Sequence, residues 1–375
     1  MLPPDKPKPD IRYLHIDVTV SCNLKCSYCY YSDFNNKASL EQEVSLERLK
    51  EVIDQAKELG CERVILSGGE PMMSAKFPPL LDYCVKRDLS ITIITNGTKM
   101  TDARLEQLLS LRDNIWEIKV SYDGPENDVV RGHGAGKETL HTINRFDEHR
   151  LPWTLNTVLT RHTWEELPRI YQWLKTMHPK AWRMDLPFSS GSYIPNRESL
   201  DVPNLEELFK RLSSLLGRYL DESPEFELWM FTIYRPGLEN ALVREKPRNI
   251  HPCTYNKRNL AIRGNGEVTP CSRFLHPMGN VKEQHLRDVR SGDGFANFWD
   301  LSIDDLNGCQ KCDYVHICGG GCRAHSFYEG QTLTGSDSGA CSTMPLFKRY
   351  IVPHFSDATQ ESFRRLISMA RSTRG

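Results

Sequence analysis

Three cysteines near the N-terminus have a spacing that suits an iron–sulfur cluster. Cys22, Cys26 and Cys29 form a C-x3-C-x2-C pattern. Three thiolates this close in sequence can ligate three irons of a [4Fe–4S] cube and leave the fourth iron without a protein ligand. An iron with an open position can bind and activate another molecule, so the spacing favours catalysis over structural support. A zinc knuckle or a chance grouping of cysteines is the alternative.

A glycine-rich turn later in the sequence could also bind a ligand. The segment Ser67-Gly-Gly-Glu-Pro71 comes directly after an apolar run at 63–66. Gly68 and Gly69 would let the backbone approach a ligand closely, and Glu70 offers an anion for an ammonium group. In the alternative interpretation, the glycines serve only the geometry of a turn and Glu70 begins a helix.

Both turns are expected at the ends of strands. From about residue 11 to residue 188, short apolar runs alternate with amphipathic stretches such as Ser45–Leu59, which predicts repeated βα units. Right-handed succession of these units gives an α/β fold, a partial (β/α)6 TIM-type barrel with functional loops at the strand C-termini. The expected strands are Tyr13–Val20, Arg63–Leu66, Ser90–Thr95, Trp116–Tyr122, Trp153–Thr160 and Trp182–Pro187.

The rest of the chain is expected to form three further parts. Residues 189–250 are irregular and then helical, and we interpret them as a bridging segment after a 1–188 barrel. Residues 251–345 are loop-rich, with many Gly and Cys and few apolar runs. We therefore expect bound metal to stabilise this domain in place of a large apolar core. Residues 346–375 are expected to be a helical tail.

Composition and charge limit the classes of binding partner and the cellular compartment that we expect for this protein. The 375 residues carry a formal net charge of −1, which gives no reason to expect nucleic acid or an anionic membrane. No apolar stretch is long enough to span a bilayer, and the Pro-rich N-terminus is not a signal peptide. We therefore expect a cytoplasmic protein, in which the 12 cysteines are metal ligands or catalytic thiols more than disulfides. Cys61 and Cys84 stand alone and are expected to be buried apolar thiols.

The cysteine loop and the Gly-Gly-Glu-Pro turn together resemble the signature of the radical S-adenosylmethionine (SAM) enzymes, with Tyr28 as the aromatic residue before the last cysteine. The resemblance implies that SAM chelates the open iron through its amine and carboxylate. Reductive cleavage would then yield a 5′-deoxyadenosyl radical that abstracts a substrate hydrogen. The implied contacts with SAM are made by Tyr28, Gly68, Gly69, Glu70, Asn96, Ser121, Asp123, Arg131 and Asn156. Asn-Gly and Asp-Gly are also common turns, so some of these residues have a purely structural alternative.

Seven cysteines near the C-terminus resemble the SPASM extension, which carries two auxiliary [4Fe–4S] clusters. The family pattern implies a distal cluster held by Cys309, Cys312, Cys318 and Cys341. It implies a proximal cluster held by Cys253, Cys271 and Cys322, which leaves a fourth position without a cysteine. A pair of zinc ribbons is the alternative, because C-x2-C and C-x3-C also suit tetrahedral zinc.

The resemblance implies a radical SAM/SPASM enzyme with three clusters, and the substrate is the open question. Sulfatase-maturing enzymes of the family have an Asp directly after the second auxiliary cysteine, whereas this chain has Ser272. We therefore expect a ribosomal peptide substrate that is cross-linked, epimerised or oxidised. An electron donor such as flavodoxin or ferredoxin and a separate leader-recognition protein are the implied partners. The alternatives are a dehydrogenase, epimerase or decarboxylase of a carbohydrate or aminocyclitol, and a non-enzymatic iron–sulfur or zinc scaffold. The sequence identifies no catalytic residue that acts on the substrate.

Overall fold

The structure is a computed structural model that describes residues 10–231, 234–242, 251–253, 258–330 and 332–372. Its contacts divide the chain into two compact units, and each unit is assembled from three segments. Unit 1 comprises the described residues within Met1–Asn23, Tyr31–Val120 and Tyr255–Trp299. Unit 2 comprises those within Leu24–Tyr30, Ser121–Thr254 and Asp300–Gly375. The domain boundaries expected from the sequence remain a prediction.

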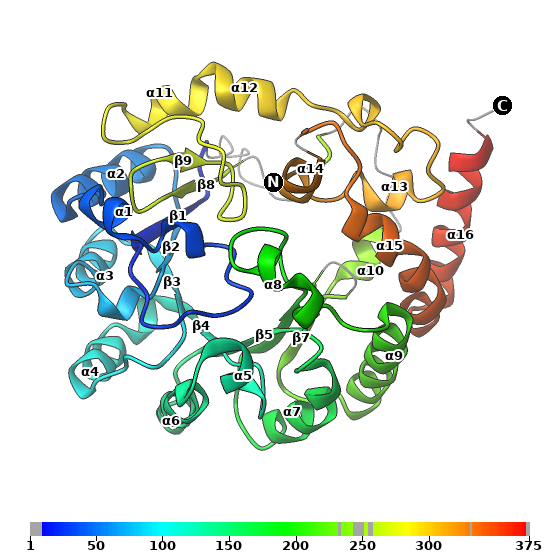
Figure 1. Ribbon diagram of the computed structural model, residues 1–375, viewed down its shortest axis with the longest axis horizontal. Helices are drawn as coiled ribbons and strands as arrows, with labels where there is room; N and C mark the ends of the chain where they lie inside the picture. The colour runs from blue at the N-terminus through cyan, green and yellow to red at the C-terminus, as the bar shows by residue number, and fades with distance from the viewer. Residues whose placement is uncertain (1–9, 232–233, 243–250, 254–257, 331, 373–375) are drawn as a thin grey trace, which may run out of the picture. The chain divides into compact units, whose positions relative to one another are not determined.

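Unit 1 is built on a sheet in the order β4-β3-β2-β1-β8-β9. The pairs from β4 to β8 are parallel, and β9 is antiparallel to β8. Figure 1 shows the yellow β8 and β9 ribbons beside the blue β1. The strands are β1 Tyr13–Thr19, β2 Arg63–Gly68, β3 Ser90–Thr95, β4 Ile115–Ser121, β8 Asn259–Ile262 and β9 Val268–Thr269.

Alternation along β1 explains its place in the sheet. Leu14, Ile16 and Val18 point to one face and are fully buried. His15 and Asp17 point to the other face and are also buried, which requires polar partners on that side. One strand therefore supplies both an apolar packing surface and a buried polar row.

The helices of unit 1 follow from amphipathic sequence and local caps. In α2, the Ser45 side chain accepts from Arg48 N, and the buried stripe is Leu49, Val52, Ile53 and Ala56. This helix agrees with the expected one. Helices α2, α3 and α4 lie along the outer side of the strands (Figure 1). The helices are α1 Lys37–Glu41, α2 Leu46–Glu58, α3 Phe77–Lys86, α4 Asp102–Ser110, α11 Leu286–Ser291 and α12 Asp293–Trp299.

Unit 2 has three parallel strands in the order β7-β6-β5 and many helices. The strands are β5 Trp153–Val158, β6 Ala181–Asp185 and β7 Glu227–Met230. The helices before residue 250 are α5 Asn127–Arg131, α6 Ala135–Glu148, α7 Leu167–Leu174, α8 Tyr193–Leu200, α9 Leu205–Glu222 and α10 Leu238–Leu242. Those after it are α13 Val315–Cys318, α14 Arg323–Gly330, α15 Ser338–Leu346 and α16 Asp357–Ser372.

All six expected strands are present, and every observed end lies within two residues of the expected one, because each strand has a clear apolar run. The region at 251–345, expected to be mainly loops, also contributes β8, β9 and several short helices. Each of these elements has nine residues or fewer, which is too short for a clear periodic pattern, so the sequence does not predict them. Among the described residues, no helix is long and apolar enough to cross a membrane.

Candidate functional site

The Gly-Gly-Glu-Pro turn of unit 1 packs its backbone against the end of β1. Gly69 N donates to Thr19 O at 2.8 Å, and Glu70 N donates to Ser21 O at 2.8 Å. A Cβ atom on Gly68 would clash with Thr19 O, and one on Gly69 would clash with Ser21 O. The glycines are therefore required by the segment that leads into the cysteine loop, and the turn fixes the start of that loop.

The Glu70 carboxylate joins this turn to the end of β3. It is fully buried and accepts from Thr95 Oγ1 at 2.7 Å, Asn96 N at 2.7 Å and Met72 N at 3.1 Å. Burial raises the pKa of Glu70 to about 7, against the opposing effect of these donors. Both carboxylate oxygens accept hydrogen bonds inside unit 1, so Glu70 has a structural function besides the expected contact with the SAM amine.

Asn96 reaches the first cysteine of the loop. Its Nδ2 lies 3.9 Å from Cys22 Sγ and donates to Asn23 Oδ1 at 3.1 Å. Its Oδ1 accepts from Thr98 N at 2.8 Å, and Asn23 Nδ2 donates to Thr98 Oγ1 at 2.8 Å. Asn96 is therefore a donor toward the Cys22 sulfur, held in place by two residues that the sequence analysis missed. The sequence offers only unspecific hints of their role: Asn23 is next to a cysteine, and Thr98 follows an Asn-Gly turn.

In unit 2, three of the expected SAM contacts bond to one another. The fully buried Asp123 accepts from Arg131 Nε at 2.8 Å and from the Tyr28 hydroxyl. Val158 N also donates to Asp123 Oδ1 at 2.8 Å, and the Arg131 guanidinium lies 5.3 Å from the centre of the Tyr28 ring. Burial raises the pKa of Tyr28 well above its usual value, so Tyr28 is a neutral donor. This Tyr28–Asp123–Arg131 triad locks the aromatic residue of the cysteine loop.

Backbone hydrogen bonds connect the rest of that loop to other segments of unit 2. Ser27 N donates to Val130 O at 2.8 Å in α5, and Ser192 N donates to Cys29 O at 2.9 Å just before α8. Burial has the larger effect and raises the pKa of the Cys26 thiol, and the nearby Arg131 cation offsets only part of this rise. Arg131 therefore supplies a positive charge that partly compensates the burial of the thiolate that an iron ligand requires.

Asn156 has a buried side-chain acceptor that none of the described residues uses. Its backbone O accepts from Tyr122 N at 2.9 Å, but its buried Oδ1 has no hydrogen-bond partner among the described residues. A buried acceptor without a partner fits a ligand that brings a donor, as the SAM ribose would. Ser121 ends β4 and is half-buried. Asn156 therefore fits the implied cofactor, and the individual SAM contacts remain predictions.

Four of the C-terminal cysteines converge on one pocket of unit 2. This pocket of about 290 Å³ is lined by Cys309, Cys312, Cys318 and Cys341, together with Asp337. These are the four cysteines that the family pattern assigns to the distal cluster. Tyr314 N donates to Cys312 Sγ at 3.4 Å, which is typical of a backbone that supports a sulfur ligand. The thiol donor set and the shared cavity fit an iron–sulfur cluster.

Asp337 connects this pocket to Cys322. Its carboxylate accepts from Cys322 N at 2.7 Å and from Ala340 N at 3.1 Å, where it caps the helix that carries Cys341. A Cβ on Gly321, which has a φ of +73°, would press on the Asp337 side chain. Cys253 and Cys322 belong to unit 2, whereas Cys271 belongs to unit 1. Among the described residues, no three His, Cys, Asp or Glu side chains lie close enough to hold a single metal ion.

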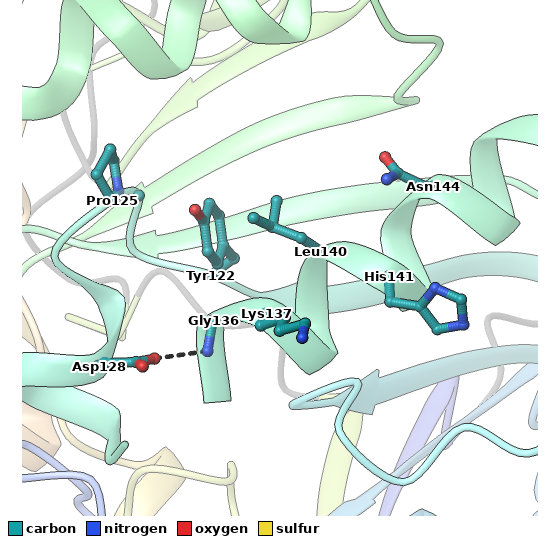
Figure 2. A pocket seen from close by; sticks show the side chains of 9 residues that line it. Tyr122, Pro125, Asp128, Gly136, Lys137, Leu140, His141 and Asn144 are labelled. Carbon is teal, nitrogen blue, oxygen red and sulfur yellow. Dashed lines mark hydrogen bonds between the residues drawn. The ribbon is translucent and has the colours of Figure 1, made fainter. Parts of the chain in front are cut away.

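A further pocket of unit 2 lies beside the β4–α5 turn (Figure 2). It measures about 550 Å³ and includes Tyr122 but neither Ser121 nor Asp123. Gly136 N donates to Asp128 at 2.6 Å on its wall (Figure 2). Its lining residues are Tyr122, Gly124, Pro125, Asp128, Gly136, Lys137, Leu140, His141 and Asn144.

Comparison with known proteins identifies the class. Residues 16–174 match the radical SAM superfamily, and residues 253–313 match the SPASM iron–sulfur cluster-binding domain. The chain belongs to the radical SAM superfamily and carries a SPASM domain. It is therefore a radical SAM enzyme of the SPASM type that uses SAM and [4Fe–4S] clusters, as the resemblance implied. The zinc and non-enzymatic alternatives are thereby set aside.

Two curated relatives and one solved structure illustrate the similarity. An AdoMet-dependent heme synthase of Oleidesulfovibrio alaskensis is 26% identical and covers 88% of this chain and 85% of its own. A PqqA peptide cyclase of Granulibacter bethesdensis is also 26% identical and covers 88% and 86%. The structure of native anSMEcpe with bound AdoMet and Cp18Cys peptide matches with a TM-score of 0.69 at 17% identity, over 97% of this chain and 99% of that one. The expected α/β fold, a partial barrel with a C-terminal SPASM domain, is confirmed.

Proposed function

We propose that this enzyme modifies a ribosomally made peptide by cross-linking, epimerisation or oxidation at carbon. The observation that carries the proposal is the 26% identity to a protein named PqqA peptide cyclase, which extends over most of both chains. A fold match to a chain that binds a peptide together with AdoMet supports it. An equal identity to a heme synthase keeps a small-molecule substrate as the rival that the experiment must exclude.

The residues of the cysteine loop would hold the SAM-binding cluster. Cys22, Cys26 and Cys29 ligate three irons, and Asn96 donates toward the Cys22 sulfur. SAM, when bound and reduced by one electron, would supply the radical chemistry that removes a hydrogen atom from the substrate, with methionine and 5′-deoxyadenosine as its products. The Tyr28–Asp123–Arg131 triad keeps the loop in one conformation. The proposed contacts with SAM are Tyr28, Gly68, Gly69, Glu70, Asn96, Ser121, Asp123, Arg131 and Asn156.

Two further clusters would occupy the C-terminal cysteines. The four cysteines of the 290 Å³ pocket hold the distal cluster, and Cys253, Cys271 and Cys322 hold the proximal one. A flavodoxin- or ferredoxin-type protein donates the electron, and a separate leader-recognition protein presents the peptide. We also propose a cytoplasmic location, where the thiols stay reduced.

Anaerobic turnover tests both the chemistry and the substrate. Reconstituted enzyme should bind about 12 irons and, with reductant and SAM, form 5′-deoxyadenosine. Precursor peptides encoded beside the gene and extracted metabolites are then incubated separately, and mass spectrometry follows deuterium transfer into 5′-deoxyadenosine. Replacing Cys26 by Ala should abolish SAM cleavage. Replacing Cys61, which is buried and donates to Arg63 O at 3.3 Å, is the matched control and should leave cleavage intact.

The outcomes separate the substrate classes. Deuterium transfer from a labelled peptide, with a changed peptide mass, supports the proposal. Transfer from a carbohydrate, an aminocyclitol or a porphyrin precursor, and not from any peptide, would show that the enzyme acts on a small molecule.

A further inference from the structure

A buried arginine of unit 1 lies beside the ligand Cys271. Arg263 follows β8 and is fully buried. Its Nη2 donates to Ser272 O at 2.6 Å and to Phe274 O at 3.3 Å. Both carbonyls belong to the turn that begins at Cys271, in which Phe274 N donates to Cys271 O at 3.2 Å. The guanidinium therefore fixes the backbone on the C-terminal side of an expected iron ligand.

The other side of Arg263 faces the strand that leads to the first cysteine loop. Its Nη1 lies 3.2 Å from Asp17 Oδ2 in β1, and both side chains are almost completely buried. His15 Nε2 lies 3.2 Å from the other Asp17 oxygen. The guanidinium also lies 5.5 Å from the centre of the Tyr31 ring, two residues after Cys29. One side chain thus connects the turn of Cys271 with the segments before and after the first cysteine loop.

We infer that Arg263 is the positioning residue for Cys271 in the proximal auxiliary cluster. An arginine suits this task because its planar donors reach two carbonyls and a carboxylate at once, whereas a lysine offers one point charge. Asp17 keeps the guanidinium oriented and neutralises its charge inside unit 1. Thr269 Oγ1, which donates to Cys271 O at 3.0 Å, supports the turn from β9. The inference rests on the proposed assignment of Cys271 as an iron ligand.

The test compares iron content and the spectra of the auxiliary clusters. In Arg263→Gln, iron per chain should fall from about 12 to about 8, with loss of one set of auxiliary-cluster EPR signals. Arg263→Lys should keep more iron than Gln and shift the signals of that cluster, which a purely structural role would not do. Arg48→Gln is the matched control: Arg48 also donates to two carbonyls, Val281 O at 2.6 Å and Gln284 O at 3.0 Å, away from the turn. It should keep about 12 irons and unchanged spectra.

Two more variants separate the role of Arg263 from a folding defect and from the ligand assignment of Cys271. If Arg263→Gln does not fold because Asp17 is left without its cation, the double variant Asp17→Asn/Arg263→Gln removes both charges and should show the same iron loss. Cys271→Ala tests the ligand assignment separately. Full iron in Cys271→Ala would overturn that assignment. Iron loss in Cys271→Ala with full iron and unchanged spectra in folded Arg263→Gln would overturn the role of Arg263 alone.

Discussion

Replacing Arg131 by Met should open the cysteine loop of unit 2, because it leaves the Asp123 carboxylate buried without its cation. Asp123 is fully buried and Arg131 is 7% exposed, so water cannot replace the lost bonds at 2.8 and 3.4 Å. Of the described residues, the Tyr28 hydroxyl and Val158 N would be the remaining donors to the carboxylate. Removing one partner of such a buried pair costs about 3–5 kcal/mol. Removing both charges in Asp123→Asn/Arg131→Met should cost much less, since no isolated charge remains.

Hydrogen–deuterium exchange of the cluster-free protein measures this cost locally, without assuming that the two units unfold together. Peptides covering 24–30 and 121–131 should exchange about a hundredfold faster or more in Arg131→Met, and clearly less so in the double variant. Arg87→Met is the control, because the Arg87–Asp54 pair is 42% and 31% exposed and should contribute under about 1 kcal/mol. Unchanged exchange in the single variant, or equal exchange in the single and double variants, would refute the reasoning.

Three other substitutions test single contacts. Gly69→Ala places a Cβ against Ser21 O and should cost about 1–3 kcal/mol, seen as a lower melting temperature; an unchanged value would contradict the close packing of the turn. The raised pKa of Glu70, about 7, stabilises the cluster-free fold below about pH 4.5, and this contribution of about 3 kcal/mol is lost as the pH rises through 7. Glu70→Gln should lack that part of the pH dependence in melting curves from pH 4 to 8, and an identical dependence would argue against it. Asn156→Ala should weaken SAM binding about tenfold by calorimetry at an unchanged melting temperature; equal affinity would remove its Oδ1 from the site.

The sequence predicts the fold and the ligand types well because both have strong local signals. The βα alternation needs only apolar periodicity, and the cysteine spacings are dictated by cluster geometry. The convergence of Cys309, Cys312, Cys318 and Cys341 on one pocket agrees with the expected group. The strand β8, with four residues, has too little pattern to be recognised.

The polar partners could not be predicted, because they depend on which segments meet in space. Asp123 and Arg131 were expected to contact SAM, and nothing in the sequence indicates that they bond to each other. Gly68 and Gly69 were expected to let the backbone approach a ligand, and the structure adds a close approach to the backbone of Thr19 and Ser21 that the sequence does not indicate. The sequence does not indicate a role for Arg263, because its partner Asp17 lies 246 residues earlier in the chain. Alternating polar residues at positions 15 and 17 of β1 were the one available hint.

The pairing of β1 with β8 has a consequence for biosynthesis. One edge of β1 is completed only by β8, with Tyr13 opposite Asn259. During translation this edge therefore stays unpaired until most of the chain has left the ribosome, and an open strand edge invites wrong pairing. Expression of residues 1–250 as an isolated barrel should accordingly yield an aggregation-prone product. The cluster-binding region cannot be removed as a detachable module, because it supplies a strand of the first sheet.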